Sequence, residues 1–472
     1  MKAIEIKNLT ISYKKLENPL LKDINFHLNY GEVALLSGFS GSGKSTIINL
    51  ISGIIPNLIK AQYEGEILVN NKSIESKKVS EISKEVGVVM QNAELQIINE
   101  LVEDEIAFGP ENLGIAKEEI ISIVNKYSNE LGLNKKSKTK TLSGGEKQKL
   151  ITASTLAMGQ KILILDEPLA NLDNKTSHLL LSYLRSLAKN KGYAVLIVEH
   201  RVDQVYNYID KFWYLRNKTI VSLDTCECLK YKKIIKSEVN TVSSNNSIIE
   251  LNNISKDINK SLILKDINLT INKRDRLLII GDNGAGKTTL LNLIAKLIKP
   301  SSGRYQQHLF KRYNRKLGNK KWFSKVGYIF QNPNYQLFMP TVYKDINYNS
   351  QSEAITDKLI KDLDLEHLRN RHPQSLSEGE KRRVSIAGVL AGMPEVLILD
   401  EPTVGQDYES LKKIVEVLNN YYLENNATII TITHDKRCAL ALADKAILIE
   451  GKEIKKIGDF NLIKEYFKLN CY

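Results

Sequence analysis

Two glycine-rich octapeptides carry the clearest chemistry in this chain. Residues 38–45 read Gly-Phe-Ser-Gly-Ser-Gly-Lys-Ser, and residues 281–288 read Gly-Asp-Asn-Gly-Ala-Gly-Lys-Thr. Both fit the pattern G-x-x-x-x-G-K-[ST], in which the glycines let successive backbone N–H groups turn inward around phosphates. The lysine brings a positive charge to the β- and γ-phosphates, and the last hydroxyl suits Mg²⁺. The sequence therefore predicts two nucleotide sites.

The segments around each octapeptide support this interpretation. Apolar runs at 33–37 and 277–280 predict buried strands that enter the loops, and apolar residues three and four apart at 46–51 and 289–294 predict helices that leave them. The N-terminus of each helix would face the bound anion. The residues expected to bind phosphate or Mg²⁺ are Gly38, Ser40, Gly41, Gly43, Lys44, Ser45, Thr46, Gly281, Asn283, Gly284, Gly286, Lys287, Thr288 and Thr289.

Shorter motifs follow each octapeptide in the same order. The first is an apolar strand that ends in glutamine, at Gln91 and Gln331, where a side-chain amide can meet Mg²⁺ and an attacking water. The second is Leu-Ser-Gly-Gly-Glu at 142–146 and Leu-Ser-Glu-Gly-Glu at 376–380, each before a basic helical stretch. Such a serine and glycine form an anion-binding helix N-terminus, although a plain helix cap would explain either copy alone.

Acidic residues and a histidine complete each series. Apolar strands at 162–165 and 396–399 end in Asp-Glu pairs, in which the aspartate suits Mg²⁺ and the glutamate suits the water. A histidine lies 34 positions beyond each aspartate. A single histidine at a strand end is usually structural, but the equal spacing favours contact with the γ-phosphate. These residues are Asp166, Glu167 and His200 in the first half and Asp400, Glu401 and His434 in the second.

The repeat divides the 472 residues into two domains. Residues 236–247 are mostly polar, rich in serine and asparagine and without helical periodicity, which is typical of a linker. The pattern of residues 3–9 restarts at 248–254. We therefore predict a first domain at 1–235, a linker at 236–247 and a second domain at 248–472.

Composition is that of a globular chain. Charged residues make up 26% and hydrophobic residues 42%, and no apolar run reaches the roughly 18 to 20 residues that cross a bilayer. The first residues read as a strand and not as a secretory signal, so we expect the protein in the cytoplasm. The four cysteines, Cys226, Cys228, Cys438 and Cys471, are too scattered for a disulfide framework and are expected to be incidental thiols.

The formal net charge of +13 has three interpretations: a lysine-rich solvated surface, an anionic membrane surface and nucleic acid. Most basic residues are spread along the chain, which favours the first interpretation, with lipid headgroups second and nucleic acid third. One stretch between Phe310 and Phe323 does interleave basic and aromatic residues, as a nucleic-acid surface would. Its members are Lys311, Arg312, Tyr313, Arg315, Lys316, Lys320, Lys321 and Trp322.

The full series of motifs resembles the ATP-binding cassette ATPases over nearly the whole chain, twice. The resemblance implies an α/β protein of two tandem P-loop cassettes, each with a mixed or parallel core sheet, a small antiparallel β part and a helical subdomain. It implies ATP and Mg²⁺ as cofactors, with Ser45, Gln91, Asp166, Thr288, Gln331 and Asp400 at the metal. Catalytic roles would fall to Glu167, Glu401, His200, His434, Gln91 and Gln331.

In that family the two cassettes pack head to tail, so that each completes the nucleotide site of the other. By resemblance, the first P-loop would face Ser377 and Gly379, and the second would face Ser143 and Gly145. The family also stacks an aromatic residue on adenine. Tyr13 stands at that position in the first half.

The stretches after Gln91 and Gln331 are similar to those of energy-coupling factor importer ATPases, and they lie at 94–108 and 334–346. This similarity implies import of a vitamin or metal ion, with a transmembrane coupling subunit docked near those stretches and a separate membrane subunit that binds the substrate. It implies a peripheral location on the cytoplasmic face of the membrane and no nucleic-acid partner. The rival interpretation is a soluble tandem cassette ATPase that acts on ribosomes or nucleic acid, and an exporter ATPase is a third.

Two residues depart from the family pattern. The repeat places Ile258 where the first half has Tyr13, so adenine contact in the second half is open. The Leu-Ser-Gly-Gly segment is the signature motif of the family, and Glu378 replaces its first glycine in the second half. An added negative charge about 8 Å from a γ-phosphate costs on the order of 0.5 to 2 kcal/mol, depending on screening. We therefore expect slower hydrolysis at the site that pairs Lys44 with Ser377.

Overall fold

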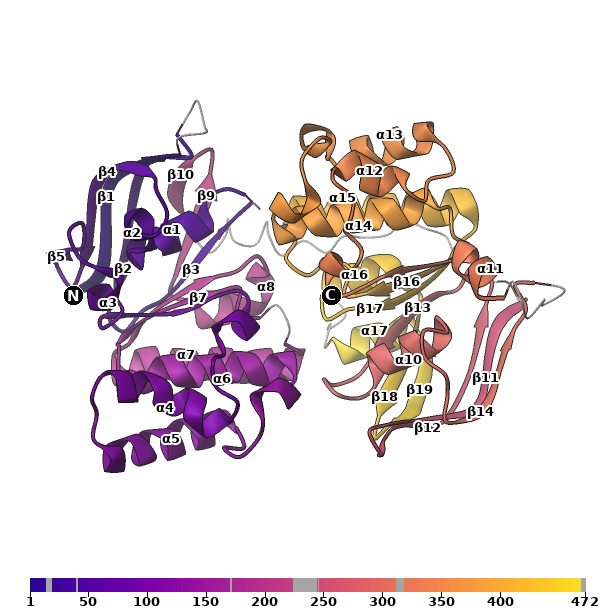
Figure 1. Cartoon of the computed structure of the whole chain (residues 1–472), viewed down its shortest axis with the longest axis horizontal. Coiled ribbons are helices and arrows are strands. Elements are labelled where there is room, and N and C mark those ends of the chain that lie inside the picture. The colour runs from indigo at the N-terminus through magenta and orange to yellow at the C-terminus, as the bar shows by residue number, and fades with distance from the viewer. Residues whose placement is uncertain are drawn as a thin grey trace. The chain divides into compact units, whose positions relative to one another are not determined.

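The computed structural model describes residues 1–13, 19–39, 41–169, 172–223, 244, 246–310 and 318–467. The chain forms two compact units, Met1–Lys233 and Ile234–Tyr472, which run from indigo to magenta and from magenta to yellow in Figure 1. Several residues named above lie outside the described part: Ser40, Cys226, Cys228, Lys311, Arg312, Tyr313, Arg315, Lys316, Cys471 and most of 236–247.

A six-stranded sheet forms the centre of the first unit. Its strands lie in the order β10, β9, β3, β8, β7 and β6, and all but β10 run parallel. The middle strands are short apolar runs, as expected for a parallel sheet covered on both faces. The bounds are β3 Val33–Gly38, β6 Val86–Val89, β7 Ile162–Asp166, β8 Ala194–Val198, β9 Lys211–Arg216 and β10 Thr219–Leu223.

A small antiparallel sheet covers one face of this central sheet. Its order is β2, β1, β4 and β5, and its alternating residues Ile4 and Ile6 share a core with Leu36 of β3 and Ile47 of helix α1. The bounds are β1 Lys2–Ser12, β2 Leu21–Asn29, β4 Gln62–Val69, β5 Lys72–Ser73, α1 Lys44–Ile51, α2 Ile54–Asn57 and α3 Val79–Ile82.

Longer helices cover the other face and form a helical subdomain. Helices α4, α5 and α6 contact one another (Figure 1), and α5 buries Ile120, Val124 and Leu131 at helical spacing. The bounds are α4 Val102–Asn112, α5 Lys117–Leu131, α6 Gly144–Ala157, α7 Asn174–Lys191, α8 Val202–Val205 and the 3₁₀ helices η1 Ala93–Gln96, η2 Thr139–Thr141 and η3 Tyr206–Tyr208.

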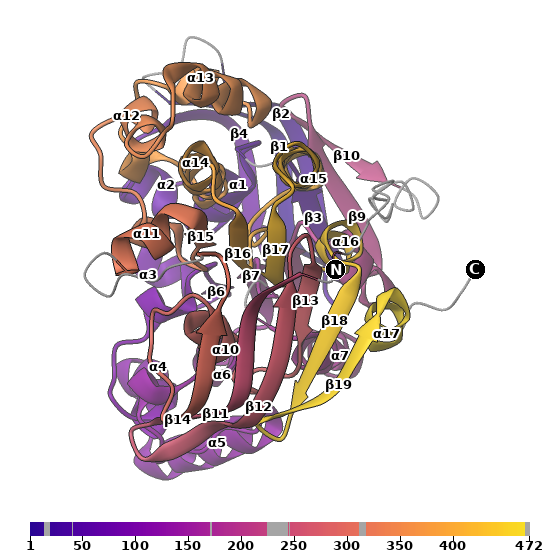
Figure 2. The same ribbon diagram turned by 90° about the vertical axis from the view of Figure 1, so that its right-hand side faces the viewer.

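The second unit repeats this plan. Its central sheet has the order β15, β16, β17, β13, β18 and β19, parallel except for β19 (Figure 2), and the small antiparallel sheet has the order β12, β11 and β14. The bounds are β11 Ser247–Ile258, β12 Ser261–Asn272, β13 Arg276–Ile280, β14 Ser302–Gln307, β15 Val326–Ile329, β16 Val396–Asp400, β17 Thr428–Ile432, β18 Lys445–Glu450 and β19 Glu453–Asp459.

The helices of the second unit follow the same order as those of the first. Helices α12 and α13 pack on α14 and form its helical subdomain. The bounds are α10 Lys287–Ile294, α11 Gly318–Lys325, α12 Val342–Asn347, α13 Glu353–Asp362, α14 Glu378–Ala391, α15 Tyr408–Asn425, α16 Lys436–Leu442, α17 Phe460–Tyr466, η5 Pro333–Tyr335, η6 Glu366–Leu368 and η7 Pro373–Ser375.

The architecture matches the α/β class expected from the motifs, with a small antiparallel sheet and a helical subdomain in each unit. The two helices after the octapeptides begin two residues earlier than the apolar spacing predicted, at Lys44 and Lys287. No helix in the described part of the chain is long and apolar enough to cross a membrane. Cys438 is buried as a free thiol, and burial raises its pKa.

Candidate nucleotide-binding sites

The lysine of each octapeptide folds back across its own loop. Lys44 Nζ donates to the carbonyl oxygens of Gly38 at 3.0 Å and Phe39 at 2.7 Å, and Lys287 Nζ donates to those of Gly281 at 2.8 Å and Asp282 at 2.9 Å. Both lysines are buried. Each ammonium group therefore lies at the centre of a curved backbone, which is the arrangement that receives a phosphate chain.

A glycine before each lysine makes the loop possible. Gly43 has φ of 106° and Gly286 has φ of 96°, a region that L side chains rarely adopt. A Cβ added at either glycine would lie 2.8 Å from a side-chain carbon of Leu21 or Leu264. Helices α1 and α10 start at the next residue, so their first backbone N–H groups point back into the loop.

Hydroxyl and carboxylate groups meet beside each loop. Ser45 Oγ donates to Asp166 Oδ2 at 3.4 Å, and the hydroxyl of Thr288 hydrogen-bonds to Asp400. Asp166 and Asp400 end the buried strands β7 and β16. A hydroxyl and a carboxylate are hard oxygen ligands, so this donor set fits Mg²⁺ held partly by substrate phosphates.

The glutamate of the first unit is held by two partners far away in sequence. Gln91 Nε2 donates to Glu167 Oε2 at 2.8 Å, and His200 Nε2 lies 3.1 Å from Glu167 Oε1. Glu167 itself has φ of 47°, an uncommon backbone conformation for a residue other than glycine. The structure therefore brings together the glutamine, the glutamate and the histidine that the sequence motifs singled out.

The second unit holds its glutamate in a similar way. The backbone N–H of His434 donates to Glu401 Oε2 at 3.2 Å, and the imidazole Nε2 of His434 lies 3.6 Å from Glu401 Oε1. Glu401 has φ of 50°, close to that of its counterpart in the first unit. The hydroxyl of Tyr328 also donates to Asp400 Oδ2 at 3.5 Å. The first unit has Val88 at the matching position, and valine cannot make this hydrogen bond. The two sites thus share a plan and differ in detail.

The two acidic residues of the first site have opposite pKa shifts. Burial and then the charge of Glu167 raise the pKa of Asp166 to about 7. Burial also acts to raise the pKa of Glu167, but the hydrogen bond and charge of His200 outweigh it, so the net shift is downward. The surroundings therefore favour the ionised form of Glu167 and the protonated form of Asp166.

The serine of each signature motif is a helix N-cap. Ser143 Oγ accepts from the N–H of Glu146 and donates to its carboxylate at 2.7 Å, and Ser377 makes the same pair with Glu380. The glycine expected to contact nucleotide, Gly145 or Gly379, lies in the first turn. The plain helix-cap interpretation is therefore correct within each unit, and it leaves the other N–H groups of the first turn open to an anion.

The two candidate adenine positions differ. Tyr13 follows β1, and its hydroxyl lies 3.4 Å from Thr46 Oγ1 at the start of α1. Ile258 ends β11 and is exposed. An aromatic ring therefore borders only the first of the two octapeptides at this position in the repeat.

The interpretation of 310–323 as a nucleic-acid surface fails for Trp322. Its ring is buried, its Nε1 donates to the carbonyl of Ala295 at 2.8 Å, and Lys296 Nζ lies 4.3 Å from the ring centroid. A buried indole is not available to stack on a base, because its faces already contact the core.

One residue was missed by the motif analysis. Arg382, just after the second signature, donates to the carbonyl oxygens of Phe330 and Gln331 and is buried. The signal in the sequence was the difference between Arg382 and Gln148 at matching positions of the repeat.

Comparison with known proteins agrees with this geometry. The family model for ABC transporters matches residues 21–170 and 264–404, once in each unit. The chain belongs to the ABC transporter family. The two units are therefore its two cassettes, as the motif series predicted, and members of this family hydrolyse ATP with Mg²⁺.

Relatives of similar length share the tandem arrangement. A Bacillus subtilis protein, assigned by name to HMP/thiamine import as the ATP-binding protein YkoD, is 31% identical over 94% of this chain and 89% of its own length. An ABC transporter ATP-binding protein of Methanosarcina mazei is 31% identical over 96% of this chain and 88% of its own length.

Solved tandem structures share the fold. The archaeal ribosome recycling factor aABCE1 superimposes with a TM-score of 0.68 over 98% of this chain and 92% of its own, at 19% identity. A structure named RNase-L inhibitor gives a TM-score of 0.67 over 95% and 90%, at 20% identity. At these identities the match establishes the fold alone.

Proposed function

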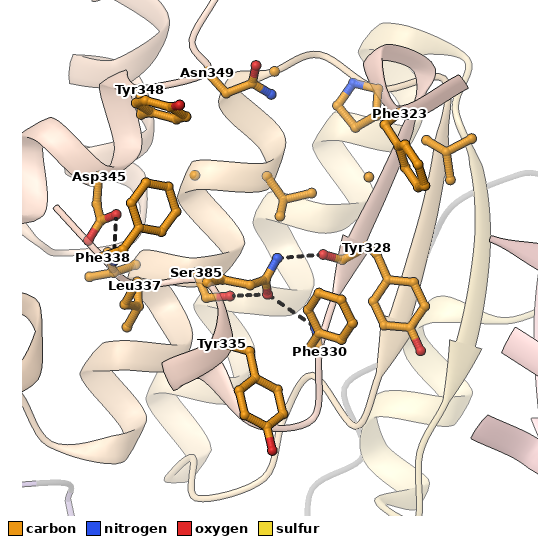
Figure 3. Close-up of a pocket in the computed structure, with 18 of the residues that line it drawn as sticks. Phe323, Tyr328, Phe330, Tyr335, Leu337, Phe338, Asp345, Tyr348, Asn349 and Ser385 are labelled. Atoms are coloured by element: carbon orange, nitrogen blue, oxygen red, sulfur yellow. Dashed lines mark hydrogen bonds between the residues drawn. The ribbon is translucent and has the colours of Figure 1, made fainter. Parts of the chain in front are cut away.

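We propose that this chain hydrolyses ATP to drive a membrane importer. The observation that carries the proposal is a groove in each cassette that begins at the strand before the catalytic glutamine. The groove of the second cassette is lined by β15, by residues 335–338 and by one face of α14 (Figure 3). The groove of the first cassette is lined by the matching elements, which are β6, Gln96, Ile98 and α6. The segments expected to lie near a coupling subunit therefore form the walls.

The groove of the second cassette is rich in exposed aromatic side chains. Tyr335, Phe338 and Tyr348 are 76%, 65% and 66% exposed, and the rings of Phe338 and Tyr348 meet edge to face with centroids 5.3 Å apart. Figure 3 shows these rings around the same hollow as Phe330 and Phe323. Clustered exposed apolar groups around a hollow mark a site for another protein.

A carboxylate ties each groove wall to the helical subdomain. Glu105 Oε2 accepts from the backbone N–H groups of Ile98 at 3.0 Å and Asn99 at 2.7 Å, and Asp345 Oδ1 accepts from those of Phe338 and Met339 at 3.3 and 3.2 Å. The tied loop is continuous with Gln91 or Gln331. A displacement of the groove wall would therefore be transmitted along a few residues of the chain to Gln91 or Gln331 in the candidate ATP site.

The occupant that we propose is a short helix of a membrane subunit that carries apolar side chains and one basic residue. The apolar part fits the aromatic rings. The basic residue fits Asp345, whose Oδ2 is buried without a hydrogen-bond partner among the described residues. A buried acceptor of this kind gains most from a charged donor.

The cargo that we propose is a vitamin or metal-ion micronutrient, moved through an energy-coupling factor complex in which another subunit selects it. The name of the Bacillus subtilis relative, which refers to HMP and thiamine import, supports a small nutrient. In this proposal the chain is peripheral on the cytoplasmic face of the membrane. We also propose that the two cassettes pair within the chain, so that the first P-loop would face Ser377 and Gly379 and the second would face Ser143 and Gly145.

Within each site we propose a fixed division of roles. The lysine and the histidine contact the terminal phosphates, and the serine or threonine holds Mg²⁺ with the aspartate and the glutamine. Bound Mg²⁺ would neutralise charge on the phosphates. The glutamate, held by its histidine and, in the first cassette, by Gln91, orients the attacking water and accepts its proton.

Recovery of the full chain from detergent-solubilised membranes tests the importer. We expect integral membrane proteins to co-purify with the wild type, and Phe338→Ser with Tyr348→Ser to lose them. Leu423→Ser is the matched control, because Leu423 is exposed on α15 of the same cassette and does not line the groove. Recovery with ribosomes and without an integral membrane protein would instead support the rival interpretation.

A further inference from the structure

In the second cassette, helix α14 is hydrogen-bonded to residues 330–336, which contain Gln331 and are called the glutamine loop below. Arg382, in the second turn of α14, donates from Nη1 to the carbonyl of Phe330 and from Nη2 to the carbonyl of Gln331. One turn further along, Ser385 Oγ donates to Gln336 Oε1 at 2.8 Å (Figure 3). Gln336 in turn accepts from the N–H of Phe330 and donates to the carbonyl of Tyr328. Two side chains of one helix thus hold both ends of this loop.

Of this network, only the bonds made by the counterpart of Gln336 to the neighbouring backbone are present among the described residues of the first cassette. Gln96 accepts from the N–H of Met90 at 2.7 Å and donates to the carbonyl of Val88 at 3.2 Å, as its counterpart does. The residue that matches Arg382 is Gln148, whose buried Nε2 has no partner among the described residues. The residue that matches Ser385 is Ile151, which cannot donate a hydrogen bond.

One ion pair does link helix and loop in the first cassette. Lys147 Nζ of α6 lies 2.7 Å from Glu94 Oε1. Glu94 is 71% exposed, so water competes for this pair and its contribution is small. Arg382 is buried instead, and hydrogen bonds from a charged donor are among the stronger ones in proteins.

Electrostatics also differs between the cassettes. Burial lowers the pKa of Arg382 to about 10, while the nearby charges of Glu401, Glu378 and Asp400 act to raise it, so Arg382 remains a cation at neutral pH. The residue at the matching position of the first cassette, Gln148, carries no charge.

We propose that Arg382 is a positioning residue that locks the catalytic glutamine loop to the helical subdomain in the second cassette only. The inference rests on the role at Mg²⁺ proposed above for Gln331. A partner that moves the groove of this cassette would move α14 and Gln331 as one body. In the first cassette the exposed Lys147–Glu94 ion pair links α6 to this loop more weakly, so Gln91 responds less directly to movement of the helical subdomain.

Amide hydrogen exchange of the full chain without nucleotide tests the lock directly. We expect residues 330–336 to exchange about tenfold more slowly than residues 90–96, because opening breaks charged hydrogen bonds. Arg382→Gln should remove most of that difference, and Gln148→Arg should slow 90–96. Arg383→Gln is the matched control, because the adjacent buried Arg383 bonds to Ser410 Oγ instead of the loop. Equal exchange of the two loops in the wild type, or an equal effect of the control, would overturn the proposal.

ATP hydrolysis supplies a second readout. With Glu167→Gln in the background, only the site of Glu401 turns over, and Arg382→Gln should lower kcat ten- to hundredfold while KM for ATP stays within about twofold. Arg382→Lys should restore part of the rate, since lysine can reach one carbonyl.

With Glu401→Gln in the background, the same substitution should change kcat by less than about threefold. Equal losses in both backgrounds would mean damage to α14 as a whole and would reject the proposal. If the chain carrying Glu167→Gln hydrolyses no ATP, the role proposed for Glu401 fails, and the exchange experiment still decides whether the lock exists.

Discussion

The side-chain amide of Gln91 donates a hydrogen bond of 2.8 Å to the carboxylate of Glu167. The donor follows β6 and the acceptor follows β7, two parallel neighbours in the central sheet. An amide at this position stabilises the ionised form of the glutamate that we propose as the base. The contact therefore links the motif at the end of one strand to the protonation state at the end of the next.

Replacing this amide tests its electrostatic role. We expect Gln91→Glu to lower kcat more than Gln91→Ala, by about tenfold, because a carboxylate beside Glu167 raises its pKa by repulsion. Both variants should be measured in a Glu401→Gln background, so that turnover reports on the first site. A larger loss for Gln91→Ala would show that the amide serves mainly to place the water or metal.

The two sites should hydrolyse ATP at different rates. Glu378 adds a charge to the signature that faces Lys44 in our proposal, but its Oε1 lies 3.1 Å from Lys381 Nζ, which offsets part of that charge. We therefore expect Glu401→Gln to be the more damaging of the two base substitutions, by about two- to fivefold. Steady-state ATPase rates of Glu167→Gln and Glu401→Gln decide the point, and a larger loss for Glu167→Gln contradicts it.

Adenine should bind more tightly in the first cassette. Tyr13 offers a ring where the second cassette has Ile258, and stacking of a base on an aromatic ring is worth about 1 to 3 kcal/mol. In a Lys287→Ala background, Tyr13→Ile should weaken ATP binding by about fivefold or more in calorimetry. Tyr13→Phe should keep most of the affinity, because the ring remains. An equal loss for both variants would assign the effect to the hydroxyl that lies near Thr46.

Asp345 should make stability depend on pH. Burial raises its pKa, and the N–H groups of Phe338 and Met339 and the charge of His372 only partly offset this. Because the folded-state pKa lies above the unfolded value, the contribution of Asp345 to stability is present in acid and is lost as pH rises through the folded-state pKa.

An isosteric change isolates this effect. Asp345→Asn, which cannot ionise, should raise Tm by about 1 to 3 °C at pH 7.5 and change it little at pH 4. Thermal unfolding at both pH values measures the difference. A gain of equal size at pH 4 would show that ionisation is not its cause.

The nucleotide-binding elements could be predicted from the sequence because their chemistry is local. A P-loop needs glycines, a lysine and a hydroxyl within eight consecutive positions, so residues 38–45 and 281–288 identify it without knowledge of the fold. Strand β8 begins and ends where its apolar run does, and the signature serines cap their helices as neighbouring residues dictate. The order of motifs therefore identified the candidate sites.

Other features depend on contacts between residues far apart in the chain. Arg382 lies 52 and 51 positions from the carbonyls that it binds, and the burial of Trp322 comes from packing against the helix that follows the second P-loop. Neither contact leaves a pattern in neighbouring residues, because a backbone carbonyl has no sequence signature and an aromatic residue fits a core or a surface equally well. Residue types and spacing determined the chemistry of the two ATP sites, while side-chain packing decided how firmly each glutamine is held.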